Sequence, residues 1–294
     1  MNTLRKHAFL IIAHQQPLVL ETLLQRLDDK RNAVFLHIDR KSTRLYEQFR
    51  DYRLQHADLH VIGNRFAVHW GDISQVSVEF LLMEEATLWG PFAYYHLLSG
   101  CDLPLKSMDE LHRFFEKNQG KEFVGFWNDE SHQRDLLRKI RYYYFFTSVL
   151  HQKHSWRHRL LMPIRNILLV LQKILGIRRS LGSMEWKKGS NWVSLTHQAT
   201  SYLVCHKEEI LRRMNHTLCP DEIFVQTWLW NSPFRKDFYD TEDMRRGSMR
   251  LIDWQRGTPY IWTEKDREEL DTTPFLLARK FDDTYIYNPK RTQP

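Results

Sequence analysis

The chain contains only three cysteines, Cys101, Cys205 and Cys219, and they are widely spaced. They form no C-x-x-C pair, and an odd set of three cannot build a regular disulfide framework, which argues against a disulfide-stapled secreted domain and against a zinc ribbon. Glycine and proline are also scarce, with 11 and 10 residues among 294, which excludes a collagen-like chain. A reducing compartment fits this cysteine content best.

Long apolar runs are missing as well. No stretch approaches the roughly 18 apolar residues that a membrane-spanning helix needs. The first apolar run, 8–13, is interrupted by His14, Gln15 and Gln16 too early for a signal peptide, and we interpret it as a buried strand.

The composition that remains is that of a globular protein. Hydrophobic residues make up 42%, aromatic residues 13% and charged residues 27%, and the length suffices for one large α/β domain or two small ones. Lys and Arg number 43 against 36 Asp and Glu, a net charge of +7. This surplus predicts a surface that attracts polyanions, anionic lipids or phosphorylated small molecules.

Apolar strand patterns alternate with helical periodicity in the first half of the chain and again after residue 185. We expect strands at 8–13, 33–38, 59–62, 94–100, 121–126, 191–195 and 251–254, a late apolar segment at 275–281, and helices at 18–27, 74–86, 199–214 and 223–230. Such strand-helix-strand units form a mostly parallel sheet that binds ligands beyond the carboxyl ends of its strands. His14 and Asp39 follow two of these ends.

A basic amphipathic insertion is expected at about 145–183, within a stretch, 136–184, that has no acidic residue. Cations lie within and on either side of its apolar part, 160–177. They are Lys153, Arg157, Arg159, Arg165, Lys173, Arg178 and Arg179. Two interpretations stay open: a helix lying in an anionic membrane interface, or a core helix with a solvated basic face. His151, His154 and His158 lack an accompanying carboxylate or thiol, so we interpret them as a solvated turn rather than metal ligands.

Two carboxylates, Asp221 and Glu222, precede the helix expected at 223–230. They either cap its free N–H groups, or one of them faces a cleft as a general base.

A second candidate cluster consists of the cations Arg250, Arg279 and Lys280, which lie just before and inside apolar segments. Burying an unpaired cation is costly, so these side chains either extend to solvent or bind an anion such as a diphosphate. The chain has no D-x-D, so we expect no metal, and fixed cations would stabilise a departing diphosphate instead. Phosphate-loop, dinucleotide, serine-hydrolase and zincin motifs are missing too.

Six segments in this order resemble the core-2/I-branching β-1,6-N-acetylglucosaminyltransferase and peptide xylosyltransferase family. They are Ile12-Ala13-His14, His37-Ile38-Asp39-Arg40-Lys41, 97–105 (LLSGCDLPL), Gly189-Ser190-Asn191-Trp192, Pro220-Asp221-Glu222 and Ala278-Arg279-Lys280-Phe281-Asp282.

The resemblance implies a single GT-A-like glycosyltransferase domain over 1–294, with a Rossmann-related mixed sheet flanked by helices. It implies an inverting, metal-free transfer from a UDP-sugar with no other cofactor, in which Glu222 is the base. It also implies that Lys280 and Arg250 bind the diphosphate, and Arg279 joins them as a member of the cation cluster described above. It assigns the remaining UDP-sugar contacts to Ile12, Asp39, Val68, His69, Trp70, Ser190, Asn191 and Thr258.

Asn191 departs from the xylosyltransferase branch, which carries an acidic residue at this position, and asparagine cannot act as a base. The signal anchor, stem and disulfide cysteines of the animal enzymes are also missing, so the chain looks like a compact bacterial-type member. We therefore expect a cytoplasmic protein, free or peripheral on the inner face of the membrane. We expect transfer of N-acetylglucosamine to a glycan or glycolipid acceptor, with peripheral contact to an anionic membrane.

The alternatives are a related transferase that uses UDP-xylose or UDP-galactose, or a basic module that binds nucleic acid or a membrane surface. Because the basic residues are interleaved with leucines and no nucleic-acid motif is present, we expect no nucleic-acid partner.

Overall fold

The computed structural model describes residues 6–152 and 154–286; Lys153, one of the cations named above, lies outside these ranges. A five-stranded sheet in the order β3-β2-β1-β4-β6 forms its centre, and a three-stranded sheet, β5-β8-β7, adjoins it. The strands are β1 His7–Ala13, β2 Asn32–Ile38, β3 Asp58–Val61, β4 Tyr94–Ser99, β5 Asp102–Pro104, β6 Ser194–Thr196, β7 Arg250–Ile252 and β8 Leu277–Arg279. Strands β1 to β4 are parallel and β6 is antiparallel to β4. The expected mixed α/β sheet is confirmed.

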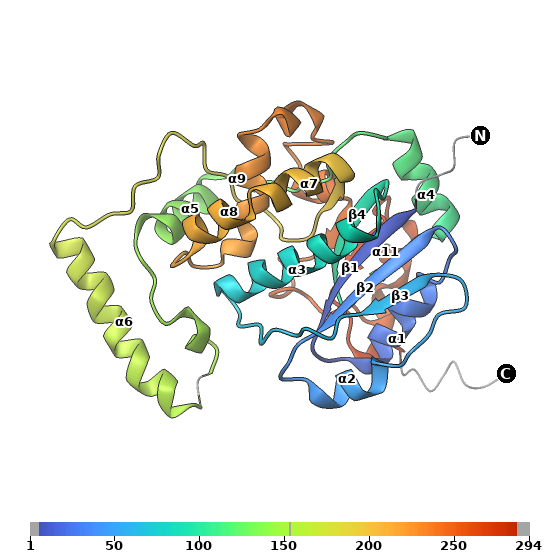
Figure 1. Cartoon of the computed structure of the whole chain (residues 1–294), viewed down its shortest axis with the longest axis horizontal. Coiled ribbons are helices and arrows are strands. Elements are labelled where there is room, and N and C mark those ends of the chain that lie inside the picture. Colours follow the sequence, from blue (N-terminus) through green and yellow to red (C-terminus); the bar gives the residue numbers. More distant parts are fainter. Residues whose placement is uncertain (1–5, 153, 287–294) are drawn as a thin grey trace.

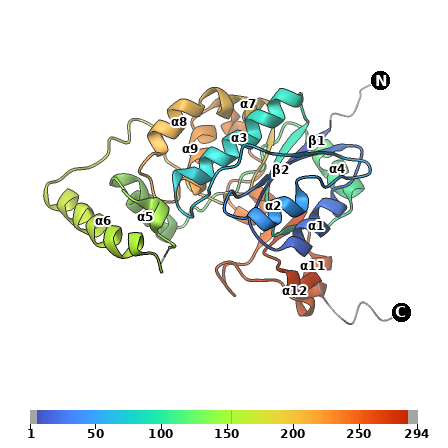
Figure 2. The same ribbon diagram turned by 60° about the horizontal axis from the view of Figure 1, so that its bottom comes forward.

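Helices cover both faces of the larger sheet (Figures 1 and 2). The helices are α1 Pro17–Arg26, α2 Thr43–Phe49, α3 Ile73–Trp89, α4 Met108–Lys117, α5 Glu130–Arg141, α6 Trp156–Ile174, α7 His197–Cys205, α8 Lys207–Met214, α9 Phe224–Trp230, α10 Met244–Ser248, α11 Arg267–Thr272 and α12 Asp283–Ile286. Alternate residues of β1 point to opposite faces. Leu10 and Ile12 pack in one core with α3, α7, α8 and α9, whereas Phe9 and Ile11 pack in the other with α1, α2, α4 and α11.

Two of the expected elements are wrong. Residues 121–126 form no strand; only isolated bridges occur, Glu122 with Phe238 and Phe123 with Ser194, because this segment pairs with two different neighbours for one residue each. The helix expected at 199–214 is two helices, α7 and α8. His206 separates them: its backbone leaves helical geometry, with φ −99° and ψ 8°, and its ring Nδ1 contacts the carbonyl oxygen of Tyr202 at 2.8 Å.

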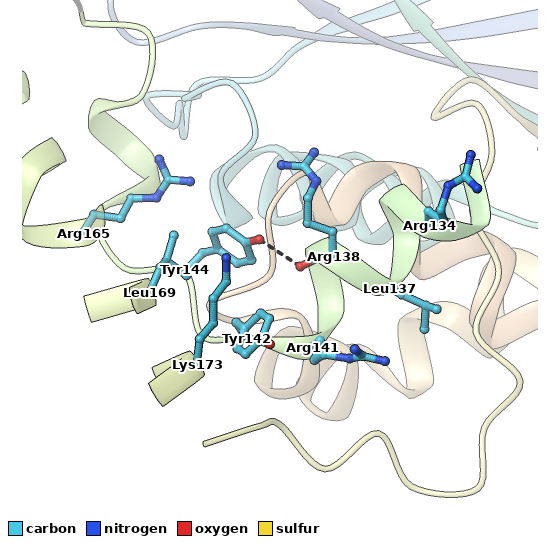
Figure 3. Close-up of a pocket in the computed structure, with 9 residues that line it drawn as sticks. All are labelled: Arg134, Leu137, Arg138, Arg141, Tyr142, Tyr144, Arg165, Leu169 and Lys173. Atoms are coloured by element: carbon cyan, nitrogen blue, oxygen red, sulfur yellow. Dashed lines mark hydrogen bonds between the residues drawn. The ribbon is translucent and has the colours of Figure 1, made fainter. Parts of the chain in front are cut away.

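Helix α6 forms within the expected insertion and lies apart from the sheet, beside α5 (Figure 1). Its apolar side chains at positions 156, 160, 164, 167, 171 and 174 recur at helical spacing and are exposed, reaching 73% exposure at Ile174, whereas Arg165 and Gln172 are its buried residues. The interpretation of this segment as a core-packing helix is therefore wrong. The inner side of α6 forms a pocket with α5 (Figure 3). Of the helices in the described ranges, none combines the length and apolar character needed to cross a bilayer.

The carboxyl ends of β1, β2 and β4 lie side by side, because the three parallel strands are paired in register. Directly after β4, Gly100 donates its N–H to the carbonyl oxygen of Ile12 at 2.9 Å. A Cβ at Gly100 would lie 2.7 Å from the Cβ of Ala13, so only glycine permits this close approach. The chain then enters β5 and the second sheet, so this edge joins the two sheets.

Candidate active site

Asp39 anchors the edge of the large sheet directly after β2. It is buried, and its N–H binds the carbonyl oxygen of Ala13 at 2.8 Å. Its carboxylate accepts the N–H of Lys41 at 2.8 Å and that of Val68 at 3.3 Å, and it forms an ion pair with the Lys41 ammonium at 3.3 Å. The Lys41 ammonium also binds the carbonyl oxygen of Val68. Asp39 thus ties the loop after β3 to the ends of β1 and β2, where the nearly buried Ile12 also lies.

Positive charge gathers around His14 at the same edge. Removal from water lowers the pKa of His14, Lys280, Arg279 and Lys41 lower it further, and Asp39 opposes them. Lys280 follows β8, and within the described ranges no carboxylate lies within ion-pair distance of its ammonium group. A half-buried ammonium without a counter-ion suits an anionic ligand.

Arg279 is fixed by two contacts beside Lys280. Its guanidinium donates to Asp102 at 2.8 Å and stacks over the Trp192 ring, 4.4 Å from the ring centroid. Asp102 also accepts the N–H of Ser99 at 2.9 Å. Burial raises the pKa of Asp102, but Arg279 and these hydrogen bonds oppose that effect. The ion pair orients Arg279 without fully neutralising the group of cations formed with Lys280.

Arg250 lies deeper than the sequence interpretation allowed for. It is only 2% exposed, so extension to solvent is wrong. Its guanidinium donates to the carbonyl oxygens of Ser248 at 2.6 Å, Val193 at 2.7 Å and Leu97 at 3.3 Å, and to the Ser194 hydroxyl at 3.1 Å. Burial lowers the pKa of Arg250 to about 10. Arg250 therefore joins β7 to β4 and β6 and adds a buried positive charge beneath the site.

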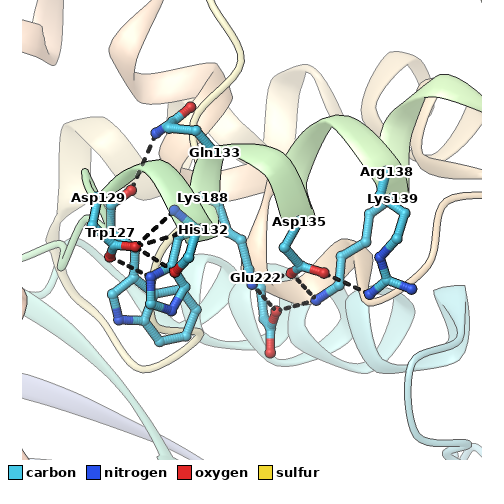
Figure 4. A network of polar contacts seen from close by, with 10 residues as sticks. Trp127, Asp129, His132, Gln133, Asp135, Arg138, Lys139, Lys188 and Glu222 are labelled. Atoms are coloured by element: carbon cyan, nitrogen blue, oxygen red, sulfur yellow. Dashed lines mark hydrogen bonds and ion pairs between the residues drawn. The ribbon is translucent and has the colours of Figure 1, made fainter.

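Glu222 does not cap the following helix. Pro220–Glu222 form a single 3-10 turn, and α9 begins without a side-chain cap. Instead, Oε2 of Glu222 contacts the ammonium of Lys139 at 2.8 Å and that of Lys188 at 3.3 Å (Figure 4). Glu222 is 23% exposed at its side chain. Among the described residues, no hydrogen bond is made to its Oε1, so that atom is open to accept one from a ligand.

Asp135 completes this network from α5. Its carboxylate contacts Lys188 at 2.6 Å, Lys139 at 3.1 Å and Arg138 at 2.5 Å. Partial burial alone would raise the pKa of Asp135, but Lys188, Arg138 and Lys139 lower it well below its usual range. Burial tends to lower the pKa of Lys139, but Glu222 and the other acidic groups nearby raise it. Lys139 therefore stays charged, and the contacts of Lys139 and Lys188 hold the Glu222 carboxylate in one orientation.

A buried acidic pair lies behind Glu222. Burial and the neighbouring Glu222 raise the pKa of Asp221 to about 7. Glu79 on α3 is fully buried, and burial together with Asp221 raises its pKa well above the usual range. Its carboxyl accepts a hydrogen bond from Gln75 at 2.9 Å and lies against the side chain of Asn191. Asn191 thus lies beside a buried carboxyl group whose pKa is raised.

The segment 188–192 links the two halves of the site. Lys188 contacts the Glu222 carboxylate, the N–H of Gly189 binds the Glu222 carbonyl oxygen at 2.9 Å, and Trp192 lies under Arg279. Four residue steps span at most about 14 Å. The carboxylate of Glu222 and the cations at the sheet edge therefore flank one short stretch of chain.

The other residues predicted to contact the UDP-sugar lie in several parts of the structure, and only some are near segment 188–192. Ser190 is buried within it, and His69 lies next to Val68, where loss of water lowers its pKa. Trp70 is exposed and packs edge-on against His151, with 4.3 Å between ring centroids. Thr258 lies in the exposed loop after β7, and no described contact brings it to the other predicted site residues. The predicted roles of these residues stay predictions.

The sequence interpretation missed Lys139, Lys188, Asp135 and Glu79. Asp135 and Lys139 are four residues apart, a spacing that predicts a contact on a helix, but nothing in the sequence connects them to Glu222. Over residues 6–152 and 154–286, no three His, Cys, Asp or Glu side chains are grouped so that they could hold a metal ion.

Known proteins are similar to this chain in sequence. The sequence model described as Core-2/I-Branching enzyme matches residues 7–273. Xylosyltransferase 1 of Rattus norvegicus is 25% identical over 312 residues, which cover 95% of this chain and 35% of that protein. Xylosyltransferase 2 of Canis lupus familiaris is 24% identical over 299 residues, 94% of this chain and 32% of that protein. The chain thus spans about a third of the length of these relatives.

Among solved structures, mouse xyloside xylosyltransferase 1 aligns with a TM-score of 0.40 at 12% identity and covers 93% of this chain and 96% of its own. The family match extends over nearly all described residues. It includes Asp39, at the end of β2, and the turn at Glu222. The chain belongs to the Core-2/I-Branching enzyme family.

Proposed function

We propose that this protein is an inverting glycosyltransferase that moves N-acetylglucosamine from its UDP-sugar to a hydroxyl group of a glycan acceptor. The observation that carries the proposal is the position of segment 188–192, which contacts Glu222 at one end and Arg279 at the other. In this arrangement a proton acceptor lies at one end of a short segment and a group of cations lies at the other. A reaction in which a hydroxyl attacks while a diphosphate leaves needs both.

Glu222 acts as the general base in this proposal. Its Oε1 takes the proton of the acceptor hydroxyl while that oxygen forms a bond to the anomeric carbon. The bond from the anomeric carbon to the UDP oxygen breaks on the opposite face, and the electron pair leaves with UDP. Lys139 and Lys188 hold Oε2, so Oε1 keeps a fixed direction. Such proton transfer contributes about 10²–10⁴-fold to rate.

Lys280 and Arg279 receive the charge that develops on the diphosphate, and the buried Arg250 adds to the positive potential beneath them. Asp39 and Ile12, at the ends of β2 and β1, hold the uridine portion. The reaction as proposed needs no metal, since the fixed cations stabilise the leaving group.

The decisive experiment combines UDP release with a base variant. Glu222→Gln keeps the size of the side chain and a hydrogen-bond acceptor, so it should lower kcat at least about 100-fold while the Kd of UDP, measured by calorimetry, changes little. Glu116→Gln, an exposed change on α4, is the control. Full turnover by Glu222→Gln would remove Glu222 from the role of base, and loss of wild-type activity on adding EDTA would refute the metal-free reaction.

UDP-xylose is the second candidate donor, because the curated relatives are named xylosyltransferases. Asn191 favours N-acetylglucosamine over it in our proposal, since the amide replaces an acidic residue. Thermal unfolding with UDP-N-acetylglucosamine, UDP-xylose and UDP-galactose separates these donors, because the donor that binds the folded state most tightly raises the unfolding temperature most.

The exposed face of α6 supports a location at the inner surface of an anionic membrane. Its apolar side chains include Leu160, Ile167 and Ile174, and the acid-free segment around them supplies cations for lipid phosphates. Ile167→Glu should abolish sedimentation with phosphatidylglycerol vesicles, whereas Leu88→Glu on α3, at a side chain 83% exposed, should leave it unchanged. Equal binding to pure phosphatidylcholine vesicles, or a dimer that Ile167→Glu dissociates, would contradict this location.

A further inference from the structure

A pocket of about 460 Å³ lies between α5 and α6, beside the Glu222 network, with which it shares Arg138 (Figure 3). Five of its lining residues are cations, Arg134, Arg138, Arg141, Arg165 and Lys173, and no acidic residue lines it. The pocket therefore carries positive charge on both of its helices, on the buried Arg165 as well as on the more exposed Arg134, Arg138 and Lys173.

Two of these cations already have carboxylate partners. Arg134 pairs with Glu130 at 2.7 Å and Arg138 with Asp135 at 2.5 Å. Within the described part of the chain, the other three, Arg141, Arg165 and Lys173, have no carboxylate within 4.0 Å. The pocket therefore keeps an excess of positive charge even after its ion pairs are counted.

Arg165 is the strongest indication of a missing anion. It is only 9% exposed, yet its Nε has no hydrogen-bond partner and its Nη1 contacts the sulfur of Met162 at 3.9 Å. It lies over the Tyr144 ring, 5.3 Å from the centroid. Burial lowers the pKa of Arg165, and the nearby Arg138 lowers it further. A buried guanidinium in this state is costly unless an anion binds it.

Helix α5 carries residues of both the pocket and the network around the proposed base, Glu222. Arg134, Arg138 and Arg141 lie on one face of α5, and Asp135 and Lys139 lie on the adjacent face, where they belong to the Glu222 network. A molecule held in the pocket therefore has only the width of one helix between it and the carboxylate that would deprotonate it.

We propose that this pocket binds a phosphoryl group carried by the acceptor glycan. Its volume exceeds that of a bare phosphate and falls in the range of pockets that hold a small organic ligand, about 300–1,000 Å³. Guanidinium groups bind phosphate oxygens through paired hydrogen bonds, and the rings of Tyr142 and Tyr144 supply a wall for an attached sugar. The assignment to the acceptor rests on the glycosyltransferase activity proposed above; the phosphate site itself does not.

The test uses phenyl phosphate as the probe and the full chain saturated with UDP, which occupies the cations at the sheet edge. Calorimetry should show one phenyl phosphate bound per chain, and benzoate should bind at least tenfold more weakly. The double variant Arg141→Gln/Lys173→Gln should weaken phenyl phosphate at least tenfold, whereas Arg159→Gln, an exposed charge on α6 outside the pocket, should leave its Kd unchanged. The single variants replace the double variant if it does not fold.

The outcomes separate this proposal from the one on which its acceptor role rests. No binding by the wild type, or equal binding by the pocket variants, overturns the phosphate site. Site-dependent binding with no UDP-sugar turnover keeps the site and refutes the transferase. With an active enzyme, the pocket variants should raise the KM of a phosphorylated acceptor at least tenfold with kcat nearly unchanged, and an unchanged KM would overturn the acceptor role.

Discussion

Glu122 gives a pH-dependent stability that can be predicted from the structure. It is 1% exposed, and its carboxylate accepts hydrogen bonds from the N–H of Thr196 at 2.9 Å and from the Thr196 hydroxyl at 2.5 Å. Burial raises the pKa of Glu122 to about 7, an effect that Thr196 opposes and Asp237 adds to. We predict that Glu122→Gln removes a pH dependence that the wild type has.

The magnitude follows from the two pKa values. The pKa of Glu122 is 4.5 in the unfolded chain and about 7 in the folded chain, and a difference of that size is worth ~3 kcal/mol. The folded state binds the proton more tightly than the unfolded state. The contribution of Glu122 is therefore most favourable below pH 4.5, is lost progressively as the pH rises to about 7, and is constant above that.

Urea unfolding of the wild type and of Glu122→Gln at several pH values from 4 to 8 measures this effect. The free energy of unfolding of the wild type, minus that of the variant, should fall by ~3 kcal/mol between pH 4.5 and 7.5. Glu116→Gln, an exposed change, controls for the altered net charge. A difference that is flat with pH, or that grows with rising pH, would show that burial does not hold the proton on Glu122.

Three further predictions concern the site and its frame. Gly100→Ala should destabilise the fold by ~1–3 kcal/mol in urea unfolding, because its Cβ would lie 2.7 Å from that of Ala13; wild-type stability would contradict the close approach. Lys139→Met should lower the free energy of unfolding by ~2 kcal/mol, because it breaks a nearly buried ion-pair network. Lys207→Met, at a more exposed pair, should lower it by under ~1 kcal/mol. Equal losses of stability would refute this ranking. Burial lowers the pKa of His37 from 6.5 to about 4, so its contribution to the free energy of unfolding is present above pH 6.5 and is lost as the pH falls to 4. The difference in that free energy between the wild type and His37→Gln should therefore drop by ~3 kcal/mol from pH 6.5 to pH 4. A difference that is constant with pH would contradict this prediction.

The order of the elements could be predicted from the sequence because local patterns determine it. Alternation of apolar runs with helical periods gave the strands around 8–13 and 33–38 and the helix at 18–27, each within a few residues. Parallel connection then placed His14 and Asp39 at one edge. The predictions failed where local pattern competes with longer contacts, as at 121–126, whose backbone bonds are divided between two neighbours, and at His206, whose ring binds the preceding turn.

The ordered motifs, the charge surplus and the missing D-x-D were visible in the sequence alone, and they were enough to identify the family and to nominate Glu222, Arg279 and Lys280. Only the tertiary structure decided what surrounds these residues. Lys139 and Glu222 are 83 positions apart, and Arg250 bonds to Leu97 in β4 and to Ser194 in β6. The direction of the apolar face of α6 also depends on what packs against its other side. Contacts of this kind arise from the way distant segments meet in space, and no local pattern of residues specifies them.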